Sequence, residues 1–82
     1  QFFKEDFARI QEIFDWYASS NELSLQPGQG YFIADSEEEM TNRIRYEIFP
    51  LIKEYLQEGL IRNAREEFNN YFAIRIYKSL FE

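Results

Sequence analysis

The residues in this chain that could perform chemistry are mainly carboxylates and arginines, because the sequence contains neither cysteine nor histidine. The densest acidic group is Asp35 together with residues 37–39, which are all glutamate. Calcium needs about six to eight oxygen ligands from a loop of defined spacing, and this segment lacks that spacing. Acidic residues also favour the positive end of a helix dipole, so the group is interpreted as a helix start. Glu66 and Glu67 would diverge by about 100° on a helix, too far to act on one substrate as a pair.

Composition narrows the possible classes of function. The 82 residues carry 9 basic and 15 acidic side chains, for a net charge of −6. No cluster of Lys and Arg suits a phosphate backbone or an anionic membrane, so we expect no nucleic-acid partner and no membrane partner. No apolar run approaches the roughly 20 residues that span a bilayer, and no signal peptide is visible. The expected compartment is the cytoplasm. Without Cys and His the chain has no thiolate metal site and lacks the commonest general base.

Aromatic side chains make up 20% of the chain, as nine Phe, six Tyr and one Trp. A domain of this length buries only about 60% of the surface that its unfolded chain exposes. Because so small a core cannot enclose all these rings, we expect several of them on the surface, facing a partner domain.

Residues 3–19 are predicted to form the first helix. Apolar residues recur there at spacings of three and four, which places them on one helical face. Ile13 and Trp16 widen this stripe, and the sequence at 19–21 ends the helix because Ser and Asn side chains compete for backbone hydrogen bonds. The stripe consists of Phe3, Phe7, Ile10, Phe14 and Tyr17.

Residues 20–35 are predicted to form a loop that packs down on the helices, because it is unusually apolar. Pro27 and Gly28 indicate a tight turn in which Pro presets φ and Gly adopts a positive φ. Gly30 supplies a second flexible point, and residues 31–34 could form a short extended piece.

Residues 36–58 are predicted to form the middle helix. Ser36 is the expected N-cap, and Glu39, three residues later, completes a capping box. Gly59 fits the position at which the helix stops.

A proline interrupts this middle helix. Pro50 lacks a backbone donor, clashes with the carbonyl of Tyr46 and disfavours the α conformation at Phe49. We therefore expect either a kinked helix or two helices that meet near Phe49.

Residues 62–80 fit two patterns. Phe68, Tyr71 and Phe72 suit a helix, whereas the alternation of apolar residues over 72–77 suits a strand. A helix is preferred because a lone strand would need a pairing partner. The whole chain is therefore expected to be one all-α domain over residues 1–82, a small bundle of three or four helices.

One stretch of the chain combines these features in an informative order. Gly28-Gln29-Gly30-Tyr31-Phe32 comes first, the acidic helix start follows, and the run Tyr-Glu-Ile-Phe-Pro-Leu-Ile-Lys-Glu-Tyr-Leu begins at Tyr46. Across residues 10–59 this order resembles the C-terminal helical lid of the MoxR-like and McrB-like branch of AAA+ ATPases. The resemblance implies that the chain is a fragment of a larger protein, that its Walker motifs lie upstream of Gln1, and that it does not hydrolyse ATP alone.

By this resemblance, the chain covers a nucleotide held in an upstream α/β ATPase core and contacts neighbouring subunits of a ring. ATP and Mg²⁺ would be cofactors of the parent protein, and the fragment itself would hold neither. Arg43 or Arg45 would sense the γ-phosphate, since a guanidinium is permanently charged and its fork matches phosphate oxygens. The loop near the nucleotide or the core domain would include Gly28, Gly30, Tyr31 and Phe32.

Other interpretations of the same residues stay open. Arg43 could instead form ordinary surface ion pairs with Glu39 or Glu47, one helical turn away on either side. Residues 27–30 could be a plain turn between helices, since they lack the Lys and Ser/Thr of a phosphate-binding loop. The whole chain could be a stand-alone acidic helical module that binds another protein through exposed aromatic side chains and has no role with nucleotide.

Overall fold

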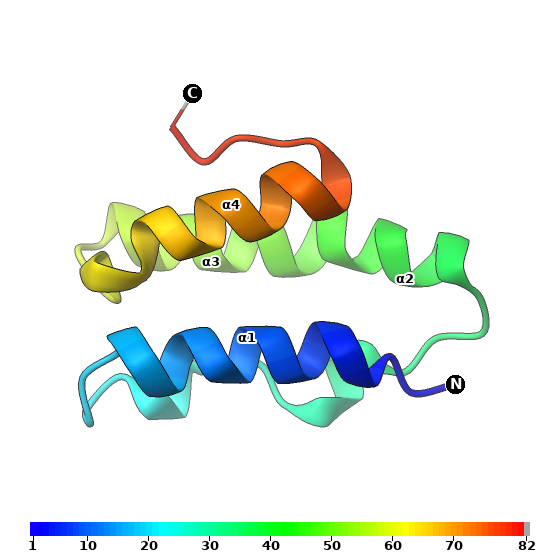
Figure 1. Cartoon of the computed structure of the whole chain (residues 1–82), viewed down its shortest axis with the longest axis horizontal. Helices are drawn as coiled ribbons and strands as arrows, with labels where there is room; N and C mark the ends of the chain where they lie inside the picture. Colours follow the sequence, from blue (N-terminus) through cyan, green and yellow to red (C-terminus); the bar gives the residue numbers. More distant parts are fainter. Residues whose placement is uncertain (82) are drawn as a thin grey trace.

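The computed structural model describes residues 1–81 and is all-helical, which confirms the expected fold class (Figure 1). Three stretches of chain form the bundle: α1, the continuous path of α2, η3 and α3, and α4. Two short 3-10 turns, η1 and η2, lie in the segment between α1 and α2. The bounds are α1 Lys4–Tyr17, η1 Leu23–Leu25, η2 Gln29–Phe32, α2 Glu37–Arg43, η3 Ile44–Ile48, α3 Phe49–Gln57, η4 Arg62–Ala64 and α4 Arg65–Ile76.

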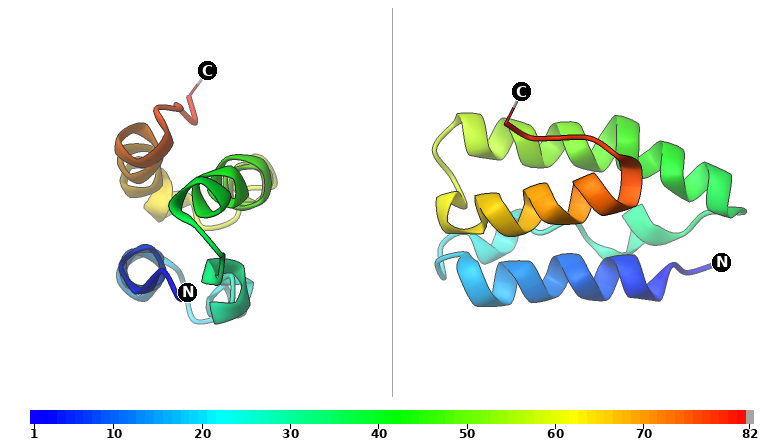
Figure 2. Two further views of the ribbon diagram at one scale, coloured as in Figure 1. Left: turned by 90° about the vertical axis from the view of Figure 1, so that its right-hand side faces the viewer. Right: turned by 45° about the horizontal axis from the view of Figure 1, so that its top comes forward.

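The helices run lengthwise along the molecule, and α4 is antiparallel to both α1 and the α2–α3 path (Figure 1). Seen end-on, the segment of residues 20–35 occupies a fourth side, next to α1 and opposite α4 (Figure 2). Three helices and one irregular segment therefore enclose a single core.

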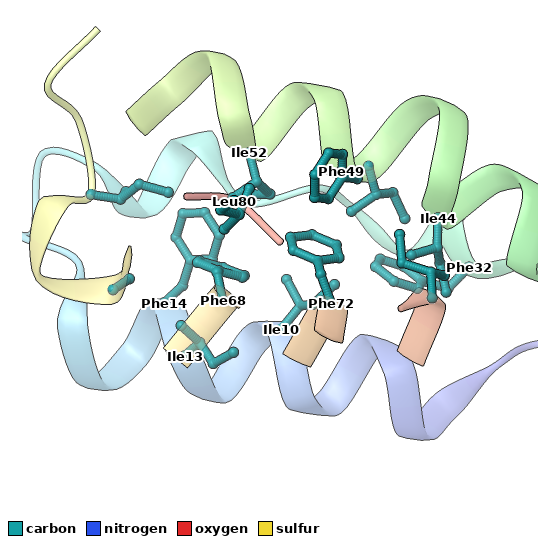
Figure 3. Packing of buried hydrophobic residues seen from close by; sticks show 14 of the residues in the cluster. Ile10, Ile13, Phe14, Phe32, Ile44, Phe49, Ile52, Phe68, Phe72 and Leu80 are labelled. Atoms are coloured by element: carbon teal, nitrogen blue, oxygen red, sulfur yellow. The ribbon is translucent and has the colours of Figure 1, made fainter. Parts of the chain in front are cut away.

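The core is built from isoleucine and phenylalanine contributed by every side of the bundle (Figure 3). Phe72 lies at its centre and packs edge-on against Phe49, with ring centroids 5.0 Å apart. Truncating such a ring costs about 3–5 kcal/mol, so these contacts dominate the stability of a domain this small. The fully buried side chains are Ile10, Ile13, Phe14, Phe32, Met40, Ile44, Ile48, Ile52, Ile61, Ala64, Phe68, Phe72 and Ile76.

The apolar face of α1 is narrower than its sequence indicates. Ile10, Ile13 and Phe14 are fully buried, but Trp16 is 76% exposed. The prediction that Trp16 belongs to the stripe was wrong, because a residue two positions after Phe14 lies about 160° from it around a helix. Trp16 thus points away from the core.

The middle helix accommodates its proline by widening. Residues 44–48 form a π-helix in which the N–H of Phe49 donates to the carbonyl of Ile44, and Pro50 becomes the second residue of α3. A proline at the start of a helix loses no hydrogen bond, and the wider π turn takes the chain past the blocked position. The prediction that Phe49 leaves the α conformation was wrong: its φ and ψ are −58° and −50°. Its burial against Phe72 favours the helical geometry.

Local signals set both ends of this helical path. The Ser36 side chain accepts from the N–H of Glu39 at 3.1 Å, as expected, but the Glu39 carboxylate reaches back to the N–H of Asp35 rather than to that of Ser36. At the other end Gly59 has a φ of +81°. The N–H of Gly59 donates to the carbonyl of Leu56, and the N–H of Leu60 donates to the carbonyl of Tyr55. These bonds satisfy carbonyls in the last turn of α3.

The segment before α2 is more ordered than a loop. Gly28 has a φ of −74°, so the prediction of a positive φ there was wrong. It is the N-cap residue of η2, and Pro27 before it is buried. Of the residues expected to be extended, Ile33 pairs with Phe2 in an isolated antiparallel bridge, whereas Tyr31 and Phe32 lie in η2. The bridge ties this segment to the start of α1.

The last segment is a helix, not a strand, and α4 ends at Ile76. Tyr77 then adopts a φ of +58°, which reverses the chain. Residues 77–81, which we call the strap, run back over α3 and α4 (Figure 2). Leu80 inserts into the core, and the side-chain oxygen of Asn69 accepts from the N–H of Leu80 at 2.7 Å. Within residues 1–81, no helix has the length and apolar character needed to cross a membrane.

Candidate functional site

Arg43, at the end of α2, holds the η2 segment in place. Its Nη1 donates to the carbonyl of Ile33 at 2.6 Å and lies 3.4 and 3.5 Å from the carbonyls of Tyr31 and Gly30. One guanidinium nitrogen thus contacts three carbonyls at the end of a 3-10 turn, and its short hydrogen bond is the one to Ile33. Arg43 is a clamp between α2 and η2.

The remaining charge of Arg43 is also balanced within the chain. Glu39 and Glu47 each place a carboxylate oxygen 3.7 Å from its guanidinium, one turn before and one turn after it. The surface ion pairs that the sequence also indicates for Arg43 are therefore present. Its side chain is only 23% exposed.

A groove of about 510 Å³ opens beside this clamp. It brings together four of the six residues singled out by sequence, namely Gly28, Gly30, Tyr31 and Arg43, and adds Glu47. A methyl group at either glycine would meet no atom within 4 Å, so the glycines leave this surface open. Glu47 could have been included from sequence by its position four residues after Arg43.

The other two candidate residues lie elsewhere. Phe32 is fully buried and its ring packs against Phe7 at 5.4 Å between centroids, so it belongs to the core. Arg45 lies in the π-helical turn and is half-buried. Among residues 1–81 it forms no ion pair and no side-chain hydrogen bond, which leaves its guanidinium available.

A second polar cluster joins α1, α2 and α4, and sequence reasoning missed it. Asp6 accepts from the Tyr71 hydroxyl at 2.7 Å and from Nε of Arg75 at 2.9 Å. Arg75 also reaches Glu37 at 2.9 Å and the Thr41 hydroxyl at 3.1 Å. Asp6 is separated from Tyr71 and Arg75 by 65 and 69 positions in the sequence, so no local pattern could indicate these contacts.

The charges in this cluster are well compensated. The side chains of Asp6 and Arg75 are 12% and 19% exposed, and each has at least two partners. Burial, and then the hydrogen bond to Asp6, raise the pKa of the Tyr71 hydroxyl far above its ordinary value. A groove of about 720 Å³ at this end of the bundle is lined by the same Asp6, Glu37 and Arg75. Because their hydrogen-bonding groups already face one another, the cluster serves to join the helices.

A carboxylate also fastens the opposite end of the bundle. Glu22 accepts from the N–H of Ser19 at 3.0 Å and from that of Ile61 at 2.9 Å. The hydrogen bond from Ser19, and then that from Ile61, lower the pKa of Glu22. Ile61 is a buried β-branched residue with a φ of +45°, a conformation that such residues rarely adopt. The Glu22 contact helps to hold this strained turn.

The described residues contain no group of three or more His, Cys, Asp or Glu side chains placed to bind a metal ion. What the groove beside Arg43 offers is a tyrosine ring, two open glycines, an arginine and a carboxylate. This set suits recognition of a neighbouring group rather than bond-making chemistry.

Comparison with family models, with curated proteins and with solved structures finds no match in any of the three. The class that the structure defines is a small helical bundle.

Proposed function

We propose that the chain is the lid subdomain of a MoxR/McrB-like AAA+ ATPase, where it covers the nucleotide site and couples ATP hydrolysis to contacts between ring subunits. The observation that carries the proposal is the convergence of Gly28, Gly30, Tyr31 and Arg43 on one groove. These residues come from the part of the sequence that carries the resemblance. The parent protein would bind ATP and Mg²⁺ in an α/β core that precedes Gln1, and would work in the cytoplasm.

Within this proposal the two arginines have different roles. Arg43 is committed to backbone carbonyls and to two carboxylates, and withdrawing it would break the 2.6 Å hydrogen bond to the carbonyl of Ile33. Arg45 has no such commitment among residues 1–81 and sits in a π-helical turn, a feature frequent at functional sites. Arg45 is therefore the arginine that reaches the nucleotide, and Arg43 positions the loop.

The first test is the sequence of the parent gene upstream of Gln1. Walker A and Walker B motifs are expected there, because the fragment supplies no phosphate-binding loop of its own. A start codon or an unrelated domain immediately before Gln1 would overturn the proposal.

The second test uses the full-length parent ATPase. Arg45→Ala is expected to lower kcat for ATP hydrolysis by about a hundredfold, as loss of one charged donor to a transferring phosphate does. Lys4→Ala, which removes an exposed cation at the first residue of α1, is the matched control and should leave kcat unchanged. Full activity in Arg45→Ala would refute the role given to Arg45 even if the Walker motifs are present.

The second candidate function is a stand-alone helical module that binds another protein. The observation that favours it is the exposure of large aromatic side chains, with Trp16 76%, Tyr46 68% and Tyr77 87% exposed. A module of this kind should fold alone, bury these rings against a second copy or a partner, and ignore nucleotide. Sedimentation equilibrium of the chain and of Trp16→Ser tests it: a concentration-dependent dimer lost in the variant supports the module, and monomers throughout speak against the homodimer form.

A further inference from the structure

Only some of the Lys and Arg side chains of this acidic protein form ion pairs among residues 1–81. Of the nine Lys and Arg residues, Arg9, Arg43 and Arg75 form all the ion pairs found within residues 1–81. Three of the others line two neighbouring grooves where α3, the start of α4 and the strap meet. We call this surface the basic face; it consists of Lys53, Arg62 and Arg65.

Phe81 forms a ridge in the middle of the basic face. The Arg65 guanidinium lies 4.6 Å from the centroid of its ring, which is half exposed. A groove of about 240 Å³ flanks the ridge on the side of Lys53, and one of about 390 Å³ flanks it on the side of Arg62. Both grooves are lined by Arg65 and Phe81. A ligand crossing the ridge would therefore meet a cation on each side of an aromatic ring.

The fold holds this ridge in position. Asn69 fixes the strap through the N–H of Leu80 and the hydroxyl of Ser79, at 2.7 and 3.3 Å. Leu80 is buried in the core immediately before Phe81. Lys53 and Lys78 lie 6.0 and 5.3 Å from the Phe49 ring, so both cations are kept close to α3.

The chemistry of the ridge suits a carboxylate. Arg65 has one face against the Phe81 ring and its N–H fork unpaired among residues 1–81, which is the arrangement that binds a carboxylate through two hydrogen bonds. Glu66 is the one carboxylate among the described residues that line the two grooves. Lys53 shares a groove with Leu56 and Gln57, one turn along α3, whereas Glu54 and Glu58 are not part of that lining.

We propose that the basic face is the docking site for an acidic peptide segment of a partner protein, with its carboxylates on Arg65, Lys53 and Arg62 and an apolar side chain against Phe81. Charge complementarity supports a peptide over the other anionic partners. Nucleic acid and anionic membranes present extended arrays of charge, and the net charge of −6 disfavours their approach to the surface around this face. A short peptide contacts the basic face alone. The inference does not depend on the proposed ATPase role.

Fluorescence anisotropy tests the proposal with the whole chain and a short fluorescein-labelled peptide in which Glu alternates with Leu and Phe. We expect saturable binding that weakens as salt is added, since charge-assisted contacts are screened. Arg65→Glu should weaken it about tenfold or more, the effect of losing a charge-assisted pair. Lys4→Glu, the same change of charge at the opposite end of the chain, is the matched control and should change affinity little.

A second variant separates docking from folding. Phe81→Ala should bind the peptide several-fold more weakly while keeping the circular dichroism and melting temperature of the parent, because half of this ring is already in solvent. Absence of peptide binding to the parent chain overturns the proposal. Equal binding of a lysine-for-glutamate version of the peptide, of single-stranded DNA or of phosphatidylserine vesicles also overturns it, because each would show that carboxylate recognition is not what this face provides.

Discussion

Arg43 donates to the carbonyl of Ile33 at 2.6 Å, and this contact joins the end of α2 to the end of η2. The arginine side chain is mostly shielded from solvent and reaches two further carbonyls of the same turn. Arg43 therefore joins the segment of residues 28–33 to α2, while the bridge between Phe2 and Ile33 joins it to the start of α1.

Replacing this clamp should loosen η2 and destabilise the fold. Arg43→Ala is expected to lower the free energy of unfolding by about 1–2 kcal/mol, toward the low end for hydrogen bonds to a charged group because the site is partly open to water. Urea unfolding measures the loss, and amide hydrogen exchange should accelerate over residues 29–33. Arg45→Ala, which breaks no contact among residues 1–81, is the control; equal loss in both variants would contradict the clamp.

The Tyr71 hydroxyl is expected to resist ionisation. Burial and Asp6 raise its pKa, so the folded state favours the neutral phenol more than the unfolded state does. The stability from this preference is complete below the unfolded pKa of about 10 and is lost as pH rises above it. Tyr71→Phe should cost about 1–2 kcal/mol at neutral pH and give a shallower loss of stability in alkali. Absorbance at 295 nm should show a tyrosine ionisation that coincides with unfolding of the parent chain, and this step should be smaller in Tyr71→Phe.

The Glu22 cap should contribute to acid sensitivity. Its pKa is lowered in the folded state by the N–H groups of Ser19 and Ile61, so its stabilising effect is present above the unfolded pKa and disappears as pH falls through the folded pKa. Glu22→Gln should lower the melting temperature at neutral pH and flatten the fall in melting temperature below about pH 4.5. Glu58→Gln, at an exposed position, should follow the parent curve. A Glu22→Gln curve parallel to that of the parent would rule out this cap as a source of the acid dependence.

The three glycines should differ in how much stability a substitution by alanine costs. Gly59 has a φ of +81°, so Gly59→Ala should cost about 1 kcal/mol. Gly28→Ala and Gly30→Ala meet open space without a positive φ and should be neutral, or stabilising by up to about 1 kcal/mol. Thermal unfolding of the three variants checks the order. Destabilisation by Gly28→Ala as large as that by Gly59→Ala would mean that the η2 geometry is wrong.

What the sequence could predict was local. The Ser36 N-cap and the Gly59 stop depend on the residues within one turn of them, and both are present. The stripe of α1 depends on helical spacing, which correctly indicated Ile10 and Phe14 but also included Trp16 and Tyr17, which are exposed.

What the sequence could not predict depends on distant partners. Asp6 meets Tyr71 and Arg75 only because α1 and α4 are packed antiparallel. The carbonyl contacts of Arg43 likewise require knowing where η2 comes to rest, although its ion pairs at four-residue spacing were foreseeable. The strain at Ile61 has no local cause at all, since it follows from burial of that side chain and its contact with Glu22.

Pro50 shows how a local rule can be satisfied in an unexpected way. Pro50 has no backbone N–H, but the π turn at 44–48 and its position at the start of α3 mean that no hydrogen bond is lost. Phe49 therefore keeps the α conformation. Pro50→Ala restores an N–H that can donate to the carbonyl of Tyr46, and the π turn should then tighten toward α geometry. This change would rotate α2 relative to α3 and strain the Arg43 and Glu37 contacts, so little or no net gain in stability is expected despite the better helix propensity of alanine. NMR chemical shifts of Cα over residues 43–50 report the tightening, with Pro27→Ala as a control outside the helix. Unchanged shifts at 44–48 would show that core packing, rather than the proline, maintains the π turn.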